Sequence, residues 1–328
     1  MSSLPTVFAR KIIYRFFVFF IILTIIFLLP RLAPGTPIDY LVEDPRVPPE
    51  VRVELIKKFG LDKPIFPDQY FQFLLNFFLK FDLGYSFTYQ EPVMSVISQR
   101  IIWSVILLGG ALLISIPIGI MLGILMIRRR GVSEYLSVLG LLFLRSFPVF
   151  WVGMILLLIF SYYLKVFPLG GAMSPGVVYN TPYEYIIDVL KHLTLPLITL
   201  SAIFIPRYAL LMRSSSINVI REDFVFVAVA KGLPRREILY SYIARNSMLP
   251  VITTASIDIG FIAGGAVVTE TVYSYPGMGT LIYTAVINRD YPLLLGSFAI
   301  VTAVTLIAVT IAEFLYTFID PRVKSHEI

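Results

Sequence analysis

The sequence contains no cysteine and only two histidines among its 328 residues. Without cysteine the chain forms neither a disulfide nor a thiolate metal site, and two histidines leave little for a histidine-based metal site. We therefore expect no metal and no cofactor in this chain. The sequence also has no GxxxxGK[ST] phosphate loop and no dinucleotide-binding glycine pattern. Any nucleotide that acts with this protein must then bind to another subunit.

Charged residues are scarce as well. They make up 15% of the chain, whereas hydrophobic residues make up 57%. This balance excludes an ordinary two-domain soluble protein and predicts a multi-pass membrane protein surrounded by lipid. The net charge of +6 would suggest a nucleic-acid partner in a soluble protein. In a membrane chain, basic residues instead mark the cytoplasmic loops, so we expect no nucleic-acid partner.

Six apolar runs, none of them shorter than 14 residues, predict an all-α membrane protein with six transmembrane helices. The runs cover residues 16–29, 101–127, 136–164, 193–212, 248–268 and 293–319. The first run is followed by Pro30, Arg31 and Leu32 rather than by a small-residue cleavage site. We therefore interpret it as an uncleaved first helix, with a signal peptide as the rival interpretation.

The distribution of Lys and Arg predicts the orientation. With the N-terminus placed inside, fourteen basic residues fall in cytoplasmic segments and three fall in the short outer loops. The predicted division is a cytoplasmic N-terminus with the first helix (1–30), an extracytoplasmic region (31–100), a transmembrane core (101–319) that includes a cytoplasmic region (213–246), and a cytoplasmic tail (320–328). Within the extracytoplasmic region we expect a helix over 50–59 and an interfacial helix over 70–81.

Residues 217–250 form a charged, helix-patterned segment in an otherwise apolar chain. Apolar residues at three- to four-residue spacing predict one amphipathic helix over 217–227. Gly232 then predicts a left-handed turn, and Pro234 is expected at the first position of a second helix. Arg235 and Arg236 are expected to be exposed at this corner. The pattern by itself fits a helix on the bilayer surface and a helix that docks on a partner about equally well.

Several motifs resemble the inner-membrane permease subunits of ATP-binding-cassette (ABC) importers of the dipeptide and oligopeptide type, and the resemblance covers nearly the whole chain. They are FGLDKP (59–64), DLGYS (82–86), SFPVFWVG (146–153), HLTLPLITL (192–200), AVAKGLPRREIL (228–239), ETVYSYPGMG (270–279), RDYP (289–292) and DPRV (320–323). The most specific is AVAKGLPRREIL, which resembles the loop that docks on the ATPase subunit. The distance from its glycine to the later Leu249 and Pro250 fits the longer spacing of this subfamily.

The resemblance implies an ABC type I importer transmembrane fold with no catalytic residue in this chain. It implies a second homologous permease subunit, two cytoplasmic ATP-binding subunits that hold ATP and Mg, and an extracytoplasmic solute-binding protein. The solute implied is peptide-like, although relatives of this type also carry oligosaccharides or nickel. The implied ATPase-coupling loop contains Asp223, Ala228, Ala230, Lys231, Gly232, Pro234, Arg235 and Arg236.

Some polar and small residues inside the spans are candidates for the translocation pathway. They are Asp258, Gly260, Gly264, Gly265 and Glu270. A structural hydrogen bond to a neighbouring helix is an equal alternative for Asp258, and close helix packing is the default for the three glycines. Arg207 lies less than two turns from the predicted cytoplasmic end of its helix, so we expect its side chain to extend to that surface. We expect Glu313 to be an interfacial or helix-packing carboxylate.

The outer loop that holds Tyr273 and Tyr275 permits two interpretations. The tyrosines pack near the mouth of the pathway, which we favour, or they contact a docked binding protein. Two other function classes also compete with the importer. An ion-coupled secondary transporter would use intramembrane carboxylates and repeated halves, and no convincing repeat is found. A membrane-embedded hydrolase would need a polar cluster at depth, whereas His192 lies at the edge of a span without an evident partner.

Overall fold

The computed structural model describes residues 4–32, 62–128 and 131–319, with side chains described from residue 10 to residue 311 within those ranges. The described part is helical and contains one isolated β-bridge, between Tyr85 and Pro92. Its elements are α1 (Leu4–Leu32), η1 (Ile65–Gln69), α4 (Tyr70–Leu75), η2 (Asn76–Lys80), α5 (Val93–Arg128), α6 (Val132–Ser146), α7 (Val149–Leu156), η3 (Leu157–Tyr163), α8 (Pro182–Val219), α9 (Asp223–Ala230), α10 (Arg235–Glu237), η4 (Ile238–Ala244), α11 (Arg245–Gly260), η5 (Phe261–Gly264), α12 (Val267–Val272), α13 (Met278–Ile287) and α14 (Tyr291–Ile319).

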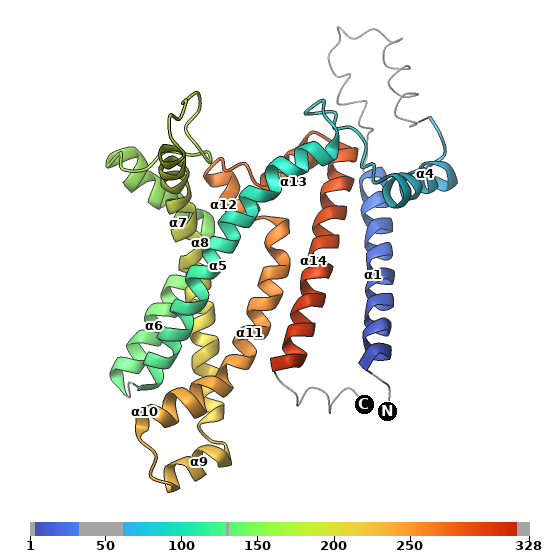
Figure 1. The fold of residues 1–328 in the computed structure, drawn as a ribbon. Coiled ribbons are helices and arrows are strands. Elements are labelled where there is room, and N and C mark those ends of the chain that lie inside the picture. The colour runs from blue at the N-terminus through green and yellow to red at the C-terminus, as the bar shows by residue number, and fades with distance from the viewer. Residues whose placement is uncertain (1–3, 33–61, 129–130, 320–328) are drawn as a thin grey trace.

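Five helices in the described residues are long and apolar enough to cross a membrane, and a bent helix pair brings the number to six. This confirms the predicted all-α membrane fold. Figure 1 places α1 beside α14 on one side of the molecule and α5, α6 and α8 on the other, with α11 between the two groups. We call the end that holds α4, α12 and α13 the α4 end, and the opposite end, where α9 and α10 project, the α9 end.

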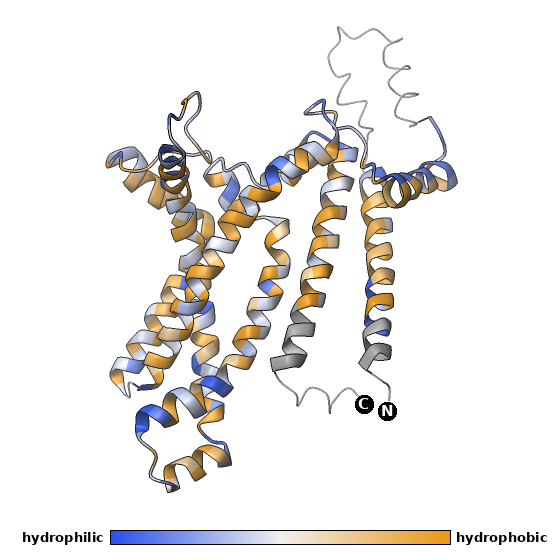
Figure 2. Ribbon diagram, in the orientation of Figure 1, coloured by the Kyte–Doolittle hydropathy of each residue, from blue (hydrophilic) through white to orange (hydrophobic). Residues whose placement is uncertain are grey.

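Hydropathy follows this arrangement. Apolar residues dominate the long helices, while hydrophilic residues gather toward the two ends and around α10 (Figure 2). Many large apolar side chains on the long helices are exposed in the isolated chain, for example Ile25 and Leu113 at 50% and 77%. Exposed apolar surface of this extent is what a bilayer or a partner subunit covers, because a soluble monomer rarely presents it.

The third span is broken, so the prediction of one continuous helix over 136–164 is wrong. Helices α6 and α7, the latter continued by η3, meet at an angle of 87°. Phe147 is extended at the junction, with φ −79° and ψ 135°, because a proline disfavours the helical conformation of the residue before it. Pro148 then caps α7.

Helices α5 and α8 pack along much of their length through two glycines of α5. A Cβ atom placed on Gly119 would lie 2.5 Å from the Cβ of Tyr208, and one placed on Gly123 would lie 2.6 Å from the Cβ of Met212. No larger residue fits at either position without moving a backbone. The pair therefore forms the closely packed centre of the bundle, and Leu112, Tyr208, Met212 and Val251 belong to its core.

The helix formed by α4 and η2 lies across the end of α1 (Figure 1), as expected for an interfacial helix, and α4 begins at Tyr70 as predicted. Tyr70 is buried against Phe27, and the hydroxyl groups of Tyr70 and Thr24 share a 2.7 Å hydrogen bond. Helix α5 begins at Val93, eight residues before the predicted run. The helix predicted over 50–59, the DPRV motif and the side chain of Glu313 lie outside the described residues.

Candidate functional site

The α9 end of the molecule is formed by a short helix between two turns. Helix α8 ends at Val219, and Glu222 is extended, with φ −76° and ψ 144°, before α9 begins. The prediction of one helix over 217–227 is therefore wrong. The acidic Asp223 stands in the first turn of α9, where a negative charge is favourable next to the unpaired N–H groups.

Gly232 forms the left-handed turn that the sequence predicts, with φ +71°. Its N–H donates to the carbonyl of Val229 at 3.0 Å, and the N–H of Leu233 donates to the carbonyl of Ala228 at 3.4 Å. These bonds satisfy carbonyls at the end of α9. Pro234 precedes the second helix instead of starting it, which is one residue from the predicted position.

Helix α9 has apolar side chains both on the side that packs against η4 and on the side that is exposed. Val225 and Ala228 are buried against Ile238 and Ile243 of η4. Phe226 is 74% exposed and Val229 is 59% exposed. Val227 is 52% exposed as well. The helix is thus held by a small core of its own and leaves an apolar surface uncovered beyond the membrane-spanning helices.

The predicted coupling residues come together in this helix–turn–helix. Asp223, Ala230, Lys231, Gly232, Pro234, Arg235 and Arg236 are exposed, and Ala228 is buried. The exposed apolar surface of α9 therefore lies beside three exposed cations. The assignment of these residues to ATPase coupling stays a prediction.

Asp258 and Arg207 contact each other inside the bundle. The Arg207 Nη1 atom donates to both carboxylate oxygens of Asp258 at 2.9 Å, and the Tyr208 hydroxyl donates to Asp258 Oδ2 at 2.6 Å. The predicted extension of Arg207 to the cytoplasmic surface is wrong, because the guanidinium turns to this carboxylate. Asp258 has the interhelical hydrogen bonds of the structural alternative, and a role in the pathway stays a prediction.

The three glycines after Asp258 provide close packing and a chain break. A Cβ atom on Gly260 would lie 3.0 Å from Val309, and one on Gly264 would lie 3.5 Å from Val301, so this stretch packs closely against α14. Gly265 ends the helical stretch with a φ of +71°. The position requires a glycine, because a Cβ atom there would lie 2.4 Å from the Gly279 nitrogen. The predicted run to residue 268 is therefore too long.

Glu270 is fully buried where α5, α12 and α13 meet. Its carboxylate accepts hydrogen bonds from Ser104 Oγ at 2.8 Å, from the Ala266 N–H at 3.0 Å and from the Thr280 N–H at 2.9 Å. A Cβ atom on Gly277 would lie 2.3 Å from this side chain. Glu270 thus joins three helices at the α4 end, and its predicted place in the pathway stays a prediction.

The two loop tyrosines pack inside the protein, as the favoured interpretation predicts. Tyr273 and Tyr275 are 2% and 1% exposed. The Tyr273 hydroxyl shares a 2.8 Å hydrogen bond with Thr199 Oγ1 and donates to the Gly153 carbonyl at 3.2 Å. Tyr273 therefore fastens the loop after α12 to α7 and α8.

Asp290 is a structural residue that the sequence reasoning missed. It is fully buried and accepts hydrogen bonds from Ser86 Oγ at 2.5 Å, from the Thr88 N–H at 2.9 Å and from the Leu293 N–H at 3.2 Å. An aspartate just before an apolar helix is a helix-capping signal, which could have identified the bond to Leu293. The bonds to the segment before α5 join residues more than 200 positions apart, and no local pattern reports them.

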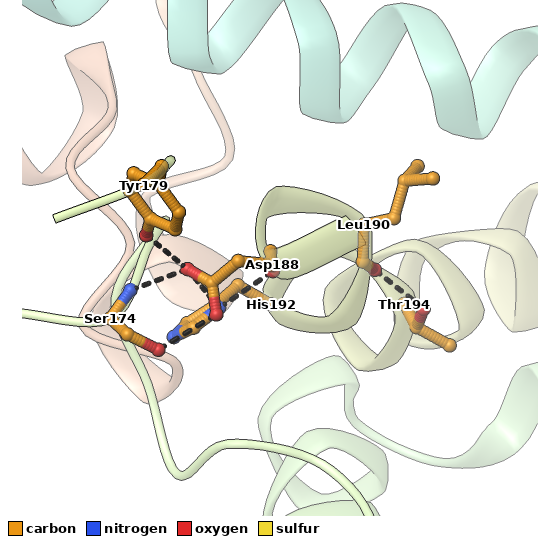
Figure 3. A network of polar contacts seen from close by, with 6 residues as sticks. All are labelled: Ser174, Tyr179, Asp188, Leu190, His192 and Thr194. Carbon is orange, nitrogen blue, oxygen red and sulfur yellow. Dashed lines mark hydrogen bonds and ion pairs between the residues drawn. The ribbon is translucent and has the colours of Figure 1, made fainter. Parts of the chain in front are cut away.

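A second missed cluster joins the loop between η3 and α8 to the first turns of α8. Figure 3 shows Asp188 accepting hydrogen bonds from the Ser174 N–H, Ser174 Oγ and the Tyr179 hydroxyl, each at 2.7 Å. The Tyr179 hydrogen bond to Asp188 raises the pKa of that phenol. The prediction that His192 has no partner is wrong, because its Nδ1 lies 2.9 Å from the Asp188 carbonyl oxygen. Within the described residues, no group of three or more His, Asp or Glu side chains is arranged to hold a metal.

The family and the relatives of this chain agree with the fold. The family model for the inner membrane component of binding-protein-dependent transport systems matches residues 115–325. The di/tripeptide transport system permease protein of Pseudomonas aeruginosa is 30% identical over 320 residues, covering 93% of this chain and 95% of the relative. The oligopeptide transport system permease protein of Bacillus subtilis is 31% identical, covering 91% and 92%.

A peptide permease protein of Brucella ovis, provisionally so named, is 36% identical over 307 residues, covering 92% of this chain and 93% of the relative. The alignments span almost the full length of each protein, so the similarity concerns the whole architecture and not an isolated motif. The chain belongs to the family of binding-protein-dependent inner-membrane transport components, and it is a permease subunit of an ABC importer.

Proposed function

We propose that this chain forms, together with a second homologous permease, the membrane pathway of an ATP-driven importer for a peptide-like solute. An extracytoplasmic binding protein delivers the solute, and two separate cytoplasmic subunits bind ATP and Mg. The names of the relatives support the peptide-like solute, because three of them are peptide, di/tripeptide and oligopeptide permeases. The chain has no phosphate loop of its own, which supports a separate ATPase.

The observation that carries the coupling role is the exposed apolar surface of α9. Phe226, Val227 and Val229 are all more than half exposed, on a helix that projects from the α9 end (Figure 1). Exposed apolar surface of this kind, next to Lys231, Arg235 and Arg236, suits a protein partner whose cleft accepts a short helix. The partner is an ATP-binding subunit, and movement of its cleft moves α9.

The core behind α9 explains how such a movement reaches the membrane. Val225 and Ala228 pack on Ile238 and Ile243, and η4 continues directly into α11. A displacement of α9 therefore shifts the start of a membrane-spanning helix that carries Asp258. In an importer, ATP and the loaded binding protein each shift the balance between outward-open and inward-open states through different contacts with the two states.

The proposed orientation puts the α9 end in the cytoplasm. Fourteen Lys and Arg residues fall on that side and three in the short loops of the other side, as the charge rule requires for cytoplasmic loops. Both chain termini are then cytoplasmic, and the α4 end faces the binding protein. At that end the hydrogen bonds of Glu270 and Asp290 connect α12 and α13 to α5, and α14 to the segment before α5. These bonds hold the surface in place before the binding protein docks.

The test uses two exposed valines near the α9 end. Val229→Asp places a charge on the apolar surface of α9, and Val132→Asp places one on the first turn of α6, where the valine is 74% exposed. Both variants are purified with their partner subunits. We expect Val229→Asp to lose the ATP-binding subunits and ATP-driven uptake, while Val132→Asp retains both.

Two results contradict the coupling role. Either Val229→Asp keeps the ATP-binding subunits and normal uptake, or both variants lose them equally because any new charge at this end is harmful. The solute is tested separately with labelled peptides, an oligosaccharide and nickel. Uptake of oligosaccharide or nickel without uptake of peptide would replace the peptide-like solute and leave the coupling role intact.

A further inference from the structure

The break between α6 and α7 holds a charged side chain that none of the contacts above uses. Arg145 lies one residue before the end of α6 and is exposed. Among the described residues it has no ion pair and no hydrogen-bonded side-chain partner. Glu134, on the same helix, is already paired with Arg213, whose Nη2 lies 2.5 Å from its carboxylate.

The Glu134–Arg213 pair also indicates how deep Arg145 lies. It joins the first turn of α6 to α8, and each helix rises about 1.5 Å per residue. Arg145 is eleven residues beyond Glu134, and the same distance back along α8 reaches Ala202. Ala202 is in the middle of the apolar run 193–212. Arg145 therefore lies at about the mid-depth of the membrane-spanning bundle.

The contacts of α7 place its second turn between this depth and the α4 end. Gly153, five residues after the junction at Pro148, accepts a hydrogen bond at its carbonyl from Tyr273. A Cβ atom on Gly153 would lie 3.6 Å from Thr199, which is also within the apolar run of α8. The bend of 87° is thus a break inside the bilayer region and not a turn at its surface.

Two physical requirements then apply at one place. A charged side chain at mid-membrane is costly, so it faces the interior of a bundle or a water-filled cavity and finds a counter-charge. A broken helix at membrane depth is tolerated only where its free backbone groups are buried in protein or line such a cavity. Lipid alone satisfies neither requirement, so this face of α6 and α7 is covered by the second permease or lines the aqueous pathway between the two subunits.

The bend is also held in shape by a ladder of aromatic rings. Phe143 contacts Phe147 edge to face with ring centroids 4.9 Å apart, and Phe147 stacks on Trp151 at 4.8 Å with an interplanar angle of 10°. Phe143 and Trp151 remain 68% and 42% exposed. The bend is thus held in shape by side-chain packing within this chain, without a ligand.

We propose that Arg145 binds a carboxylate of the transported solute inside the membrane pathway. The inference rests on the proposed function, because a peptide-like solute carries a C-terminal carboxylate. A guanidinium matches a carboxylate in geometry and charge. A single ion pair in a hydrated pathway also releases the solute again, as transport requires.

The experiment measures uptake in vesicles that hold the complete importer. One labelled peptide is offered with a free C-terminal carboxylate and with a C-terminal amide, each at a saturating concentration of loaded binding protein. The variants are Arg145→Gln and Arg145→Lys, with Arg128→Gln, an exposed arginine at the end of α5, as the control. The uptake rate of each variant is divided by the wild-type rate for the same peptide. This ratio does not depend on which of the two peptides the binding protein prefers.

We expect Arg145→Gln to slow uptake of the free peptide about tenfold, as loss of one charge-assisted hydrogen bond does, and to leave uptake of the amide unchanged. Arg145→Lys restores part of the difference, and Arg128→Gln changes neither rate. The inference is overturned if Arg145→Gln slows both peptides equally, or if it releases the second permease from the complex, since Arg145 then serves assembly. If the wild-type importer moves other solutes but neither peptide, the proposed solute is wrong and the carboxylate site falls with it.

Discussion

Arg207 on α8 and Asp258 on α11 form an ion pair among the membrane-spanning helices, with the Arg207 Nη1 atom 2.9 Å from both carboxylate oxygens. The Arg207 side chain is 39% exposed and that of Asp258 is 12% exposed. Tyr208 adds a hydrogen bond from the residue next to the arginine. The pair links a helix of the central α5–α8 unit to the helix that follows α9, so it lies on the proposed route of coupling.

Removing the carboxylate charge should cost stability. Asp258→Asn leaves Arg207 without its counter-ion, and we expect a loss of about 1–2 kcal/mol, below the value for a fully buried pair because Arg207 is partly exposed. The double variant Arg207→Gln with Asp258→Asn should lose less than the sum of the two single variants. Thermal unfolding of the purified chain measures both, and additive losses would contradict the pairing. Unchanged uptake in Asp258→Asn would remove Asp258 from the transport mechanism.

The close approach of α5 and α8 predicts that replacing a glycine of α5 by alanine lowers stability where the glycine contacts α8 and raises it where the glycine contacts nothing. Gly119→Ala and Gly123→Ala push a methyl group into Tyr208 and Met212, and we expect each to cost about 1–3 kcal/mol. Gly109→Ala is the matched control, because a Cβ atom there meets nothing within 4 Å. Alanine should stabilise that position by about 0.5–1 kcal/mol. Melting temperatures of the three variants test this, and a lowered value for Gly109→Ala would contradict the account.

The buried carboxylate of Glu270 should not tolerate an amide. Glu270→Gln brings an NH2 group against one of three donors, the Ser104 hydroxyl and the N–H groups of Ala266 and Thr280. We expect a destabilisation of about 2–3 kcal/mol, because a buried donor loses its acceptor. Glu91→Gln, at an exposed position, is the control and should be neutral. Equal melting temperatures for both variants would show that Glu270 is not the junction described here.

The Tyr179 phenol should make the loop between η3 and α8 sensitive to alkali. Its pKa is raised because the phenol donates a hydrogen bond to Asp188. A raised pKa means that the folded loop favours the neutral phenol, so the contribution to stability is complete below the unfolded pKa of about 10 and is lost as pH rises through the folded value. Protease resistance of residues 174–181 should fall above that pH in the wild type. In Tyr179→Phe this alkaline step should be absent, and a step of unchanged size would contradict the assignment.

How much of this architecture follows from the sequence depends on whether the cause is local. Apolar run lengths identify the spans, and Gly232 identifies the left-handed turn after α9, because run length and glycine conformation are properties of a few neighbouring residues. The break at Phe147 and Pro148 has a local cause too, yet the continuous apolar composition over 136–164 concealed it. Hydropathy measures burial in lipid and is insensitive to a change of direction.

The partners of polar residues inside the bundle could not be predicted in the same way. Arg207 is close enough to the end of its helix to extend to the surface, and only the position of α11 brings Asp258 within 2.9 Å. The bond between Asp290 and Ser86 depends in the same way on the packing of α14 against the start of α5. One sequence contains no record of which distant residues meet, so these contacts come from tertiary structure alone.

Peptide uptake into vesicles that contain this chain, the second permease, the ATP-binding subunits and the binding protein tests the central claim most directly. The account predicts uptake that requires ATP and the binding protein and that persists when ion gradients are collapsed. It further predicts that an importer carrying Gly232→Asp, in the turn after α9, hydrolyses ATP in its ATP-binding subunits but takes up no peptide. Uptake that follows an ion gradient without ATP, or normal uptake by Gly232→Asp, would contradict it.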